Sequence, residues 1–295
     1  MNQSRIALLL VCLALLAGTS AWPLAAADAT KDAAVRSPGS AAKVYICPPC
    51  GGACDKLTFA KPGACPLCGM TLVEQTDRGP ITVAILLFPS VEIIDYSGPW
   101  EVFGQAGFAV HTVAEKAEPI RTAFGQRVIP DYTLEKSPPA DILLIPGGGV
   151  SDQLLANRQV IQWIQAHARE AQYVMSVCTG AFLLAKAGLL DGQTATTFHK
   201  SIDRLSQFAP MTKVVHDQRY VDNGKMITTA GLSSGLDGAL HLVAKIKGKG
   251  AAQATALRLE YRWQPDSPFA RAALADRYLP RFHDFEGTLL ATDGD

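Results

Sequence analysis

A cysteine stands where a predicted strand passes directly into a predicted helix. The segment reads Tyr173-Val-Met-Ser-Val-Cys178-Thr-Gly-Ala181, so an apolar run ends at the cysteine and small residues follow it. On a sharp strand-to-helix turn a side chain is pushed out of the sheet, and the N–H groups of the new helix favour ionisation of a thiol. Cys178 is therefore a candidate thiolate nucleophile. The alternative is a buried cysteine that packs as a small hydrophobic residue.

An acidic residue follows the first apolar run of the same region. Asp95 lies in the sequence Ile93-Ile-Asp95-Tyr-Ser-Gly98-Pro99, just before an expected helix. An aspartate in that place is commonly an N-cap, which accepts a hydrogen bond from the first helical turn. A carboxyl group held among apolar residues beside a cysteine is also suited to general acid or base catalysis. The residues alone leave both interpretations open.

A glycine-rich turn follows another apolar run, which ends at Ile145. Its sequence is Pro146-Gly147-Gly148-Gly149. Glycines let the backbone approach a ligand closely, so Gly147 and Gly148 are candidate substrate-binding residues. A nucleotide site is a weak alternative, because the chain contains neither a G-x-G-x-x-G nor a Walker pattern.

Alternating apolar runs and helical patterns must position these residues. Continuous apolar strands that alternate with helices predict a parallel sheet covered on both faces, a doubly wound α/β sandwich. Functional sites of this architecture lie at the carboxyl ends of the strands, where Cys178 and Gly147 both fall. The expected strands are 81–88, 108–114, 141–145 and 173–177, and the expected helices are 98–106, 160–168, 179–187, 201–208 and 236–247.

A short cysteine-rich segment precedes this region. Five of the seven cysteines fall between residues 47 and 68, as two C-x-x-C pairs with Cys54 between them. Such pairs indicate a tetrathiolate site that folds a segment too short to have its own core. Zinc suits four thiolates, with copper as the alternative, and the expected ligands are Cys47, Cys50, Cys65 and Cys68. Disulfides are the competing interpretation, since Cys54 makes the count odd and an exported protein meets oxidising conditions.

The N-terminus has the layout of a secretory signal. Arg5 precedes an apolar run from Ile6 to Ala17, and small residues continue to Ala27. The pattern predicts a signal peptide over 1–27, a polar linker over 28–43, and a periplasmic or secreted protein without stable membrane insertion after cleavage. An uncleaved anchor is the alternative, because no charged residue interrupts Ile6 to Ala27.

The overall composition argues against a nucleic-acid partner. In 295 residues, 27 basic side chains balance 27 acidic ones, and no stretch gathers lysine and arginine into the stripe that a polyanion would need. With 48% hydrophobic residues, the chain can bury one full-sized core and carry a small extra module. These are expected over 81–261 and 44–76, followed by a tail over 262–295.

Several short motifs of region 81–261 carry a family resemblance. The segments are Leu86-Leu-Phe-Pro89, Asp95-Tyr-Ser-Gly-Pro99, Ile145-Pro-Gly-Gly148, Ser176-Val-Cys-Thr-Gly180, Ala187-Gly-Leu-Leu-Asp-Gly192, Ala195-Thr-Thr197 and Ala230-Gly-Leu-Ser-Ser-Gly235-Leu-Asp237. Together they resemble the ThiJ/PfpI superfamily, a branch of the flavodoxin-like, class I glutamine amidotransferase-like fold, and within it the isonitrile hydratases.

The resemblance implies a role for each of three residues. Cys178 would be the nucleophile, Asp95 the general acid and base, and Thr179 a hydrogen-bonding assistant. In the hydratase-like scheme the thiolate adds to the isonitrile carbon while an acid protonates it, and water then displaces sulfur to yield an N-substituted formamide. The resemblance also implies a small-molecule substrate and a homodimer. The histidines form no ligand-spaced set, so this domain is expected to need no metal or cofactor.

One departure from the family concerns a histidine. The family commonly has His directly after the pair that matches Thr196-Thr197, whereas Phe198 stands there and His199 follows. His199 is a candidate substrate-binding residue or a helix-entry residue, which leaves a Cys-His dyad open.

The cysteine-rich segment resembles the heavy-metal-binding domain of copper and silver efflux proteins. The resemblance rests on Tyr45-Ile-Cys47 and on Cys65-Pro-Leu-Cys68-Gly-Met70. That family usually reads Cys-Pro-Met-His in the first pair, and the chain has Cys47-Pro-Pro-Cys50 there, which favours an all-sulfur site.

Two other functions compete with an exported enzyme. One is a non-enzymatic metal- or redox-responsive sensor or metal-handling protein, in which Cys178 is oxidised or binds a ligand. The other comes from relatives fused to AraC-type DNA-binding regions. The tail over 262–295 is too short for two helix-turn-helix units, and export would separate the protein from DNA.

Overall fold

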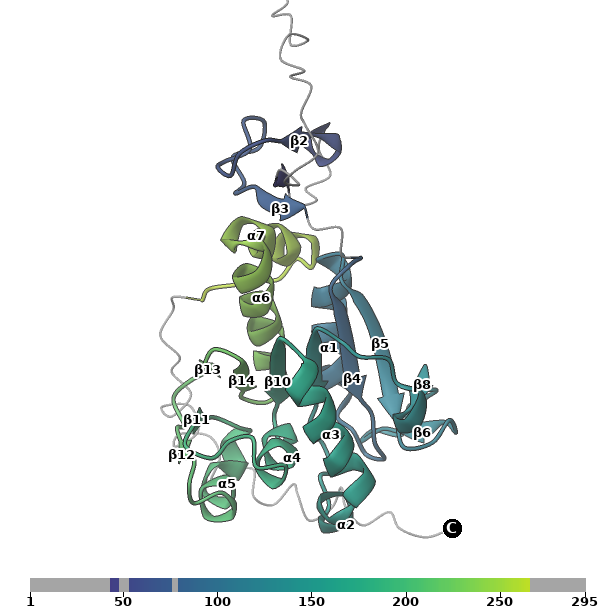
Figure 1. The fold of residues 1–295 in the computed structure, drawn as a ribbon. Coiled ribbons are helices and arrows are strands. Elements are labelled where there is room, and N and C mark those ends of the chain that lie inside the picture. The colour runs from purple at the N-terminus through teal and green to yellow at the C-terminus, as the bar shows by residue number, and fades with distance from the viewer. Residues whose placement is uncertain (1–42, 48–52, 76–78, 266–295) are drawn as a thin grey trace, which may run out of the picture. The chain divides into compact units, whose positions relative to one another are not determined.

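The computed structural model describes residues 43–47, 53–75 and 79–265 (Figure 1). The predicted signal peptide, most of the predicted linker and the tail beyond residue 265 lie outside the described residues. Within the described ranges, no helix has both the length and the apolar character needed to cross a membrane.

A seven-stranded sheet forms the centre of the main domain, and the predicted α/β class is confirmed. The strand order is β13-β14-β10-β9-β4-β5-β8, with parallel pairing except between β13 and β14. The four predicted strands are all present. The strands of the sheet are β4 Thr82–Leu86, β5 Ala109–Ala114, β8 Tyr132–Thr133, β9 Ile142–Ile145, β10 Tyr173–Val177, β13 Tyr220–Asp222 and β14 Met226–Thr229.

Burial on both faces explains why the central strands are continuous apolar runs. All of β9 is buried, and β4 from Val83 to Leu86 is at most 1% exposed. The register sets Ile142 beside both Val83 and Tyr173. The carboxyl ends of β4, β9 and β10 therefore meet at one edge of the sheet.

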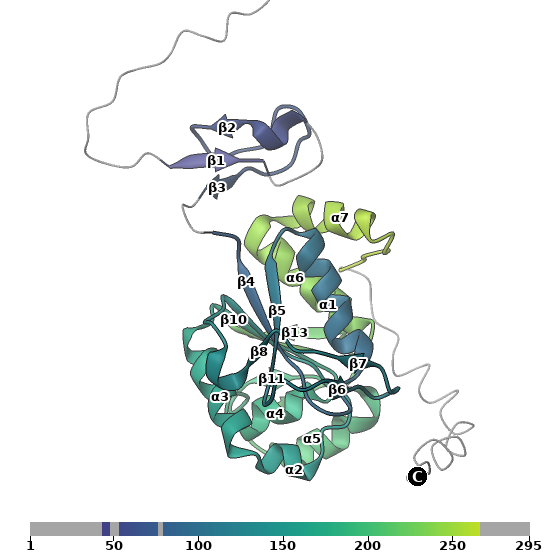
Figure 2. The ribbon, with the colours of Figure 1, turned by 90° about the vertical axis from the view of Figure 1, so that its right-hand side faces the viewer.

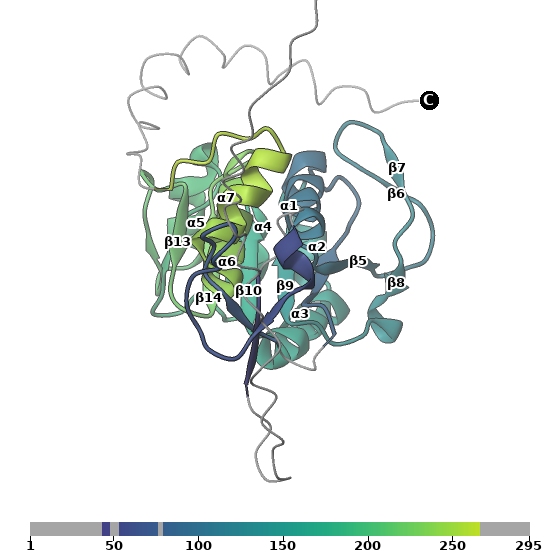
Figure 3. The same cartoon turned by 90° about the horizontal axis from the view of Figure 1, so that it is seen from above.

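Helices cover both faces of this sheet (Figure 2). One layer holds α1, α6 and α7, which pack on one another and lie side by side when seen from above (Figure 3), and the other holds α2, α3, α4 and α5. The five predicted helices are present, and α2 and α7 are additional. Their bounds are α1 Ile93–Gln105, α2 Asp152–Ala156, α3 Arg158–Glu170, α4 Gly180–Lys186, α5 Ile202–Phe208, α6 Ser234–Lys247 and α7 Lys249–Arg258.

The first helix differs most from its prediction. It begins at Ile93 rather than residue 98, although Gly98 and Pro99 disfavour a helix interior. Glu92 is the N-cap and accepts a hydrogen bond from the backbone N–H of Ile93. The interpretation of Asp95 as an N-cap is therefore wrong, because Asp95 lies inside the first turn. Gly98 allows close packing, since a Cβ there would lie 3.0 Å from a leucine side chain of α6.

Smaller elements complete the main domain. They were not predicted, because two- and three-residue elements are too short for a periodic pattern. They are the pair β6 Ile120–Arg121 and β7 Arg127–Val128, the pair β11 Thr194–Ala195 and β12 Lys213–Val214, and the 3-10 helices Leu134–Lys136 and His199–Ser201.

The cysteine-rich module, taken by itself, is a three-stranded antiparallel sheet in the order β2-β1-β3. Its elements are β1 Val44–Ile46, the 3-10 helix Ala53–Lys56, β2 Thr58–Phe59 and β3 Val73–Gln75. Its buried apolar cluster consists of Cys47, Cys54, Cys65 and Leu72.

Candidate functional site

The strand-to-helix turn predicted around Cys178 is present. β10 ends at Val177 and α4 begins at Gly180, and Cys178 between them has φ 56°, a left-handed conformation that is unfavourable for a residue with a side chain. A Cβ at Gly180 would lie 2.1 Å from the carbonyl oxygen of Ile145, so only glycine allows the helix to start there. The backbone is therefore strained at Cys178, and the turn into α4 requires a glycine at residue 180.

The carboxyl group of Asp95 lies against the thiol of Cys178. Asp95 is fully buried, and its two oxygens accept backbone N–H groups from Gly147 at 3.1 Å and Leu232 at 3.0 Å. The Cys178 thiol lies close enough to this carboxyl group for each of the two groups to shift the pKa of the other. Residues from α1, from the turn after β9 and from the loop after β14 therefore converge on one carboxyl group.

Burial sets the protonation of this pair. Loss of solvent raises the pKa of Asp95 to about 7, although its hydrogen bonds to Leu232 and Cys178 lower it and the nearby Glu92 raises it further. Burial and the Asp95 charge raise the pKa of the Cys178 thiol well above its ordinary value. The expected ease of ionisation is therefore wrong for the resting site, because desolvation and the Asp95 charge outweigh the interactions with Thr179 that lower the pKa of the thiol. At neutral pH the sulfur keeps its proton, and the Asp95 carboxyl group is close to its midpoint of ionisation.

The glycine-rich turn holds these two groups in place. A Cβ at Gly147 would lie 2.7 Å from the Cβ of Cys178 and 2.6 Å from the Thr179 nitrogen. Gly148, at φ 119°, donates its N–H to the Thr179 hydroxyl at 2.9 Å, and that hydroxyl donates to the Gly148 carbonyl at 3.0 Å. The amides of both glycines thus bind protein groups, and substrate binding by these glycines stays a prediction. The backbone and the side chain of Thr179 also lower the pKa of the Cys178 thiol.

An aromatic ring and the Cys178 sulfur both lie close to Gly231. A Cβ at Gly231 would lie 2.5 Å from Cδ2 of Phe198 and 3.5 Å from the sulfur of Cys178. The His199 ring packs on the Phe198 ring at a centroid distance of 4.3 Å, and a substrate-binding role for His199 stays a prediction. Phe198, at the sequence position where the family commonly has histidine, therefore lies near the thiol.

Sequence reasoning missed three contributions to this site. The hydroxyl of Thr197 donates to the carbonyl of Cys178 at 2.7 Å, Leu232 at φ 58° presents its N–H to Asp95, and Gly231 makes room for the Phe198 ring. The motifs that contain these residues were recognised. Their roles were not, because each role depends on a contact between segments distant in the chain.

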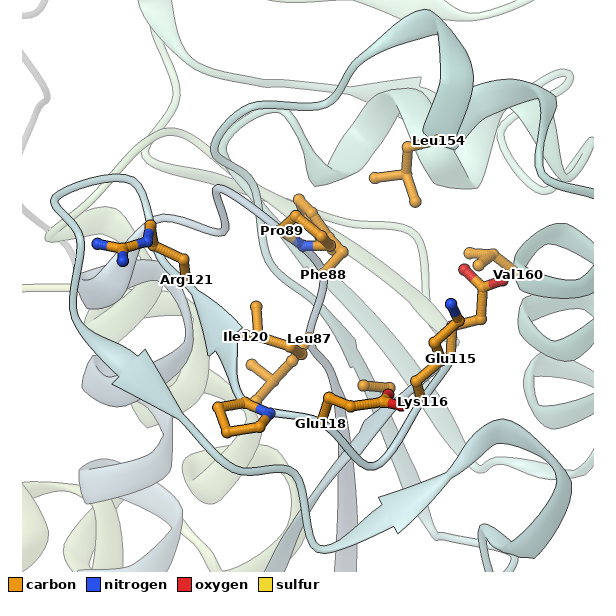
Figure 4. Close-up of a pocket in the computed structure, with 12 residues that line it drawn as sticks. Leu87, Phe88, Pro89, Glu115, Lys116, Glu118, Ile120, Arg121, Leu154 and Val160 are labelled. Carbon is orange, nitrogen blue, oxygen red and sulfur yellow. The ribbon is translucent and has the colours of Figure 1, made fainter. Parts of the chain in front are cut away.

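A pocket of about 390 Å³ lies elsewhere, at the carboxyl ends of β4 and β5 (Figure 4). Apolar side chains such as Phe88, Ile120 and Leu154 line it together with Glu115 and Lys116 from the loop after β5. Neither Cys178 nor Asp95 is among its lining residues. The pocket is therefore not part of the site around the Cys178 thiol.

Four cysteines of the module lie together. The sulfur atoms of Cys47, Cys54, Cys65 and Cys68 are all within 4.8 Å of one another. Three of the predicted ligands belong to this cluster, and the fourth, Cys50, lies outside the described residues. Cys54 was left without a role by the sequence, and the structure brings it to the other three. The cluster could hold a metal ion.

Comparison with known proteins follows the same division of the chain. The profile of the DJ-1/PfpI family matches residues 81–245, more than half of the sequence. The chain belongs to the DJ-1/PfpI family. Residues 44–75 match the heavy metal binding domain. The DJ-1/PfpI region carries the cysteine turn, Asp95 and the glycine-rich turn, and the metal-binding module carries the cysteine cluster.

Relatives of this DJ-1/PfpI chain include an isonitrile hydratase and transcriptional regulators. It is 34% identical over 193 residues to the isonitrile hydratase of Pseudomonas putida, covering 64% of this chain and 81% of that protein. It is 24% identical over 184 residues to the HTH-type transcriptional regulator GbdR of Pseudomonas aeruginosa, covering 60% of this chain and 50% of the regulator. The crystal structure of a ThiJ/PfpI family protein from Pseudomonas syringae superposes with a TM-score of 0.59 at 27% identity, over 72% of this chain and 89% of that one.

Proposed function

We propose that this protein is a cysteine-dependent hydratase that adds water to isonitriles and yields N-substituted formamides. The observation that carries the proposal is the buried Cys178 thiol beside the buried Asp95 carboxyl group at the carboxyl edge of the sheet. The similarity to an isonitrile hydratase at 34% identity supports the reaction class.

The first half of the reaction joins the substrate to the enzyme. Asp95 accepts the thiol proton as the sulfur of Cys178 adds to the terminal carbon of the isonitrile. The same carboxyl group then delivers this proton to that carbon, which gives a thioimidate with a carbon–sulfur single bond and a carbon–nitrogen double bond. The acid required in this step is the group that has just removed the proton.

The second half releases the product. Water adds to the thioimidate carbon while Asp95 takes one of its protons and passes it to the substrate nitrogen, which gives a tetrahedral adduct with a hydroxyl group. The carbon–sulfur bond then breaks as Asp95 takes the hydroxyl proton and returns it to the departing sulfur, and the carbonyl group of the formamide forms. One isonitrile and one water give one formamide, with no change of oxidation state in the enzyme.

Turnover of cyclohexyl isocyanide tests this proposal. The purified chain is expected to consume the isonitrile and to release its formamide in equal amounts, measured by NMR. A Cys65→Ser variant serves as the comparison, because it alters the metal module and leaves the thiol–carboxyl pair intact. Equal turnover by the two proteins supports an enzyme. An absence of turnover by the unmodified, metal-loaded protein would favour the metal- or redox-responsive sensor.

The protonation of the pair predicts a pH dependence. The competent state carries one proton between Cys178 and Asp95, and protonation of Asp95 adds a second one. Because the pKa of Asp95 is about 7, kcat/KM should rise as the pH increases towards 7 and then level off. The plateau should extend to alkaline pH, since burial raises the pKa of the thiol. A profile that falls between pH 6 and 8 would contradict this assignment.

The ring beside the sulfur predicts selectivity for apolar substituents. Phe198→Ala should remove apolar contact with the organic group of the isonitrile, so KM for cyclohexyl isocyanide should rise about tenfold or more with a smaller change in kcat. Gly231→Ala should lower activity in another way, because its Cβ would collide with the Phe198 ring. Steady-state kinetics with methyl and cyclohexyl isonitriles would separate the two effects. Equal KM changes for both substrates would argue against a role for the ring.

Export and dimer formation are further parts of the proposal. The N-terminal pattern of Arg5, an apolar run and small residues supports a signal peptide. Mass spectrometry of protein recovered from the periplasm or the medium would locate the cleavage site. Light scattering of the purified chain would test the expected homodimer.

A further inference from the structure

The described residues of the metal-binding module, 44–47 and 53–75, form only a small apolar core. Among these residues the buried cluster has four members, of which Leu72 is aliphatic and Cys47, Cys54 and Cys65 are each 2% exposed. Tyr45, Phe59 and Met70 pack against this cluster and are only partly buried. So small a cluster supplies little hydrophobic stabilisation, and modules of this size usually need a metal ion or disulfides.

The spacing of the sulfur atoms suits a tetrahedral ion. Zinc–sulfur bonds of about 2.3 Å place tetrahedral sulfurs about 3.8 Å apart. The sulfur–sulfur distances of the cluster lie around this value. The sulfurs of Cys47 and Cys68 are 3.3 Å apart, and all four sulfurs lie within 4.8 Å of one another. Small movements of the side chains would therefore seat an ion.

Local hydrogen bonds hold the cysteines of the cluster. Around Cys65 and Cys68, the Cys65 N–H donates to the Met70 carbonyl at 2.7 Å, and the Gly69 N–H donates to the Cys65 carbonyl at 2.8 Å. Gly69 has φ 75°, which glycine tolerates best. Cys54 lies in the 3-10 helix Ala53–Lys56. At the end of this helix the Leu57 N–H donates a hydrogen bond to the Cys54 carbonyl at 3.1 Å. This helix turns the Cys54 side chain inward.

We propose that Cys54 is the fourth ligand of a closed zinc site made by Cys47, Cys54, Cys65 and Cys68, and that the ion folds the module. Four protein thiolates leave no open position for a substrate or a transfer partner, which is typical of a structural site. The proposal departs from the sequence interpretation, which assigned the fourth position to Cys50.

A matched pair of variants tests the ligand assignment. Cys54→Ser and Cys50→Ser are compared in the full chain by zinc content and by the absorption spectrum after cobalt substitution. The unmodified protein and Cys50→Ser are expected to bind one zinc per chain and to show a four-sulfur cobalt spectrum. Cys54→Ser should show the cobalt spectrum of a site with three sulfur ligands, and its zinc affinity should fall at least about 100-fold. Substitution of residues that only hydrogen-bond a ligand already lowers metal affinity about 10- to 100-fold. The opposite ranking of the two variants would overturn the proposal.

Limited proteolysis tests the structural role. Lys56 lies in the 3-10 helix that carries Cys54, so trypsin should cut there slowly in the zinc-loaded chain and rapidly after chelation. Cleavage after Lys136, in the main domain, provides the internal control and should not respond to the chelator. Equal cleavage at Lys56 with and without zinc would overturn the structural role. A protein isolated without zinc, in which alkylation finds the cysteines paired as disulfides, would overturn the site itself.

Discussion

Replacing Cys178 by alanine is expected to abolish isonitrile hydration while the protein stays folded. No other group in the site would form the bond to the substrate carbon, so kcat should fall on the order of 10⁴-fold or more. The change removes one sulfur atom from a buried position and leaves the turn, with its glycine at residue 180, unaltered. Formamide release by NMR and thermal unfolding of the variant would measure both expectations.

Two companion variants make this test specific. Cys178→Ser keeps a hydrogen-bond donor towards Asp95 and replaces a strong nucleophile with a weak one, so it should be nearly as inactive as the alanine variant. Ser176→Ala changes a buried side chain of β10, the strand that leads into Cys178, and the Ser176 hydroxyl has no hydrogen-bond partner among the described residues. It should keep full activity and lose no stability. Substantial turnover by Cys178→Ala would require another nucleophile and would refute the mechanism.

Replacing Asp95 by asparagine should lower kcat/KM by about 10²- to 10⁴-fold, the range for removal of a general acid or base. An amide cannot take the thiol proton. It also loses one acceptor, so either Gly147 or Leu232 would face an amide NH₂ group with its own N–H. The remaining activity should show no increase towards pH 7, because the group responsible for that limb is gone. A pH profile of kcat/KM for both proteins would measure this.

Glu92→Gln is the matched control for the charge of Asp95. The Glu92 carboxylate raises the pKa of Asp95, so its neutralisation should move the acid limb of the profile to lower pH without abolishing turnover. Glutamine can still cap α1 through its side-chain oxygen. A limb that stays in place in Glu92→Gln, or that persists in Asp95→Asn, would show that another group controls the pH dependence.

The strands and most helices could be predicted from local pattern. β9 and β10 are short apolar runs bounded by turns, and their bounds agree with the prediction to within one residue. α1 shows the limit of such reasoning. Its interior contains Gly98 and Pro99, which discourage a helix locally, and packing against α6 outweighs them.

The sequence by itself determined the parts of this protein whose evidence is local. It gave the α/β class, the turn that carries Cys178, the neighbouring glycines and the two modules of the chain. Each of these depends on residues adjacent in sequence, so composition and spacing are enough to identify them.

The tertiary structure decided how these parts act together. It brings Leu232 to Asp95 across 137 residues and Phe198 close to the thiol, and it buries Cys178 and Asp95 so that the sulfur keeps its proton. It also gathers Cys54, and not only the C-x-x-C cysteines, into the sulfur cluster. Contacts and desolvation of this kind arise when distant segments pack together, and no local pattern in the chain encodes them.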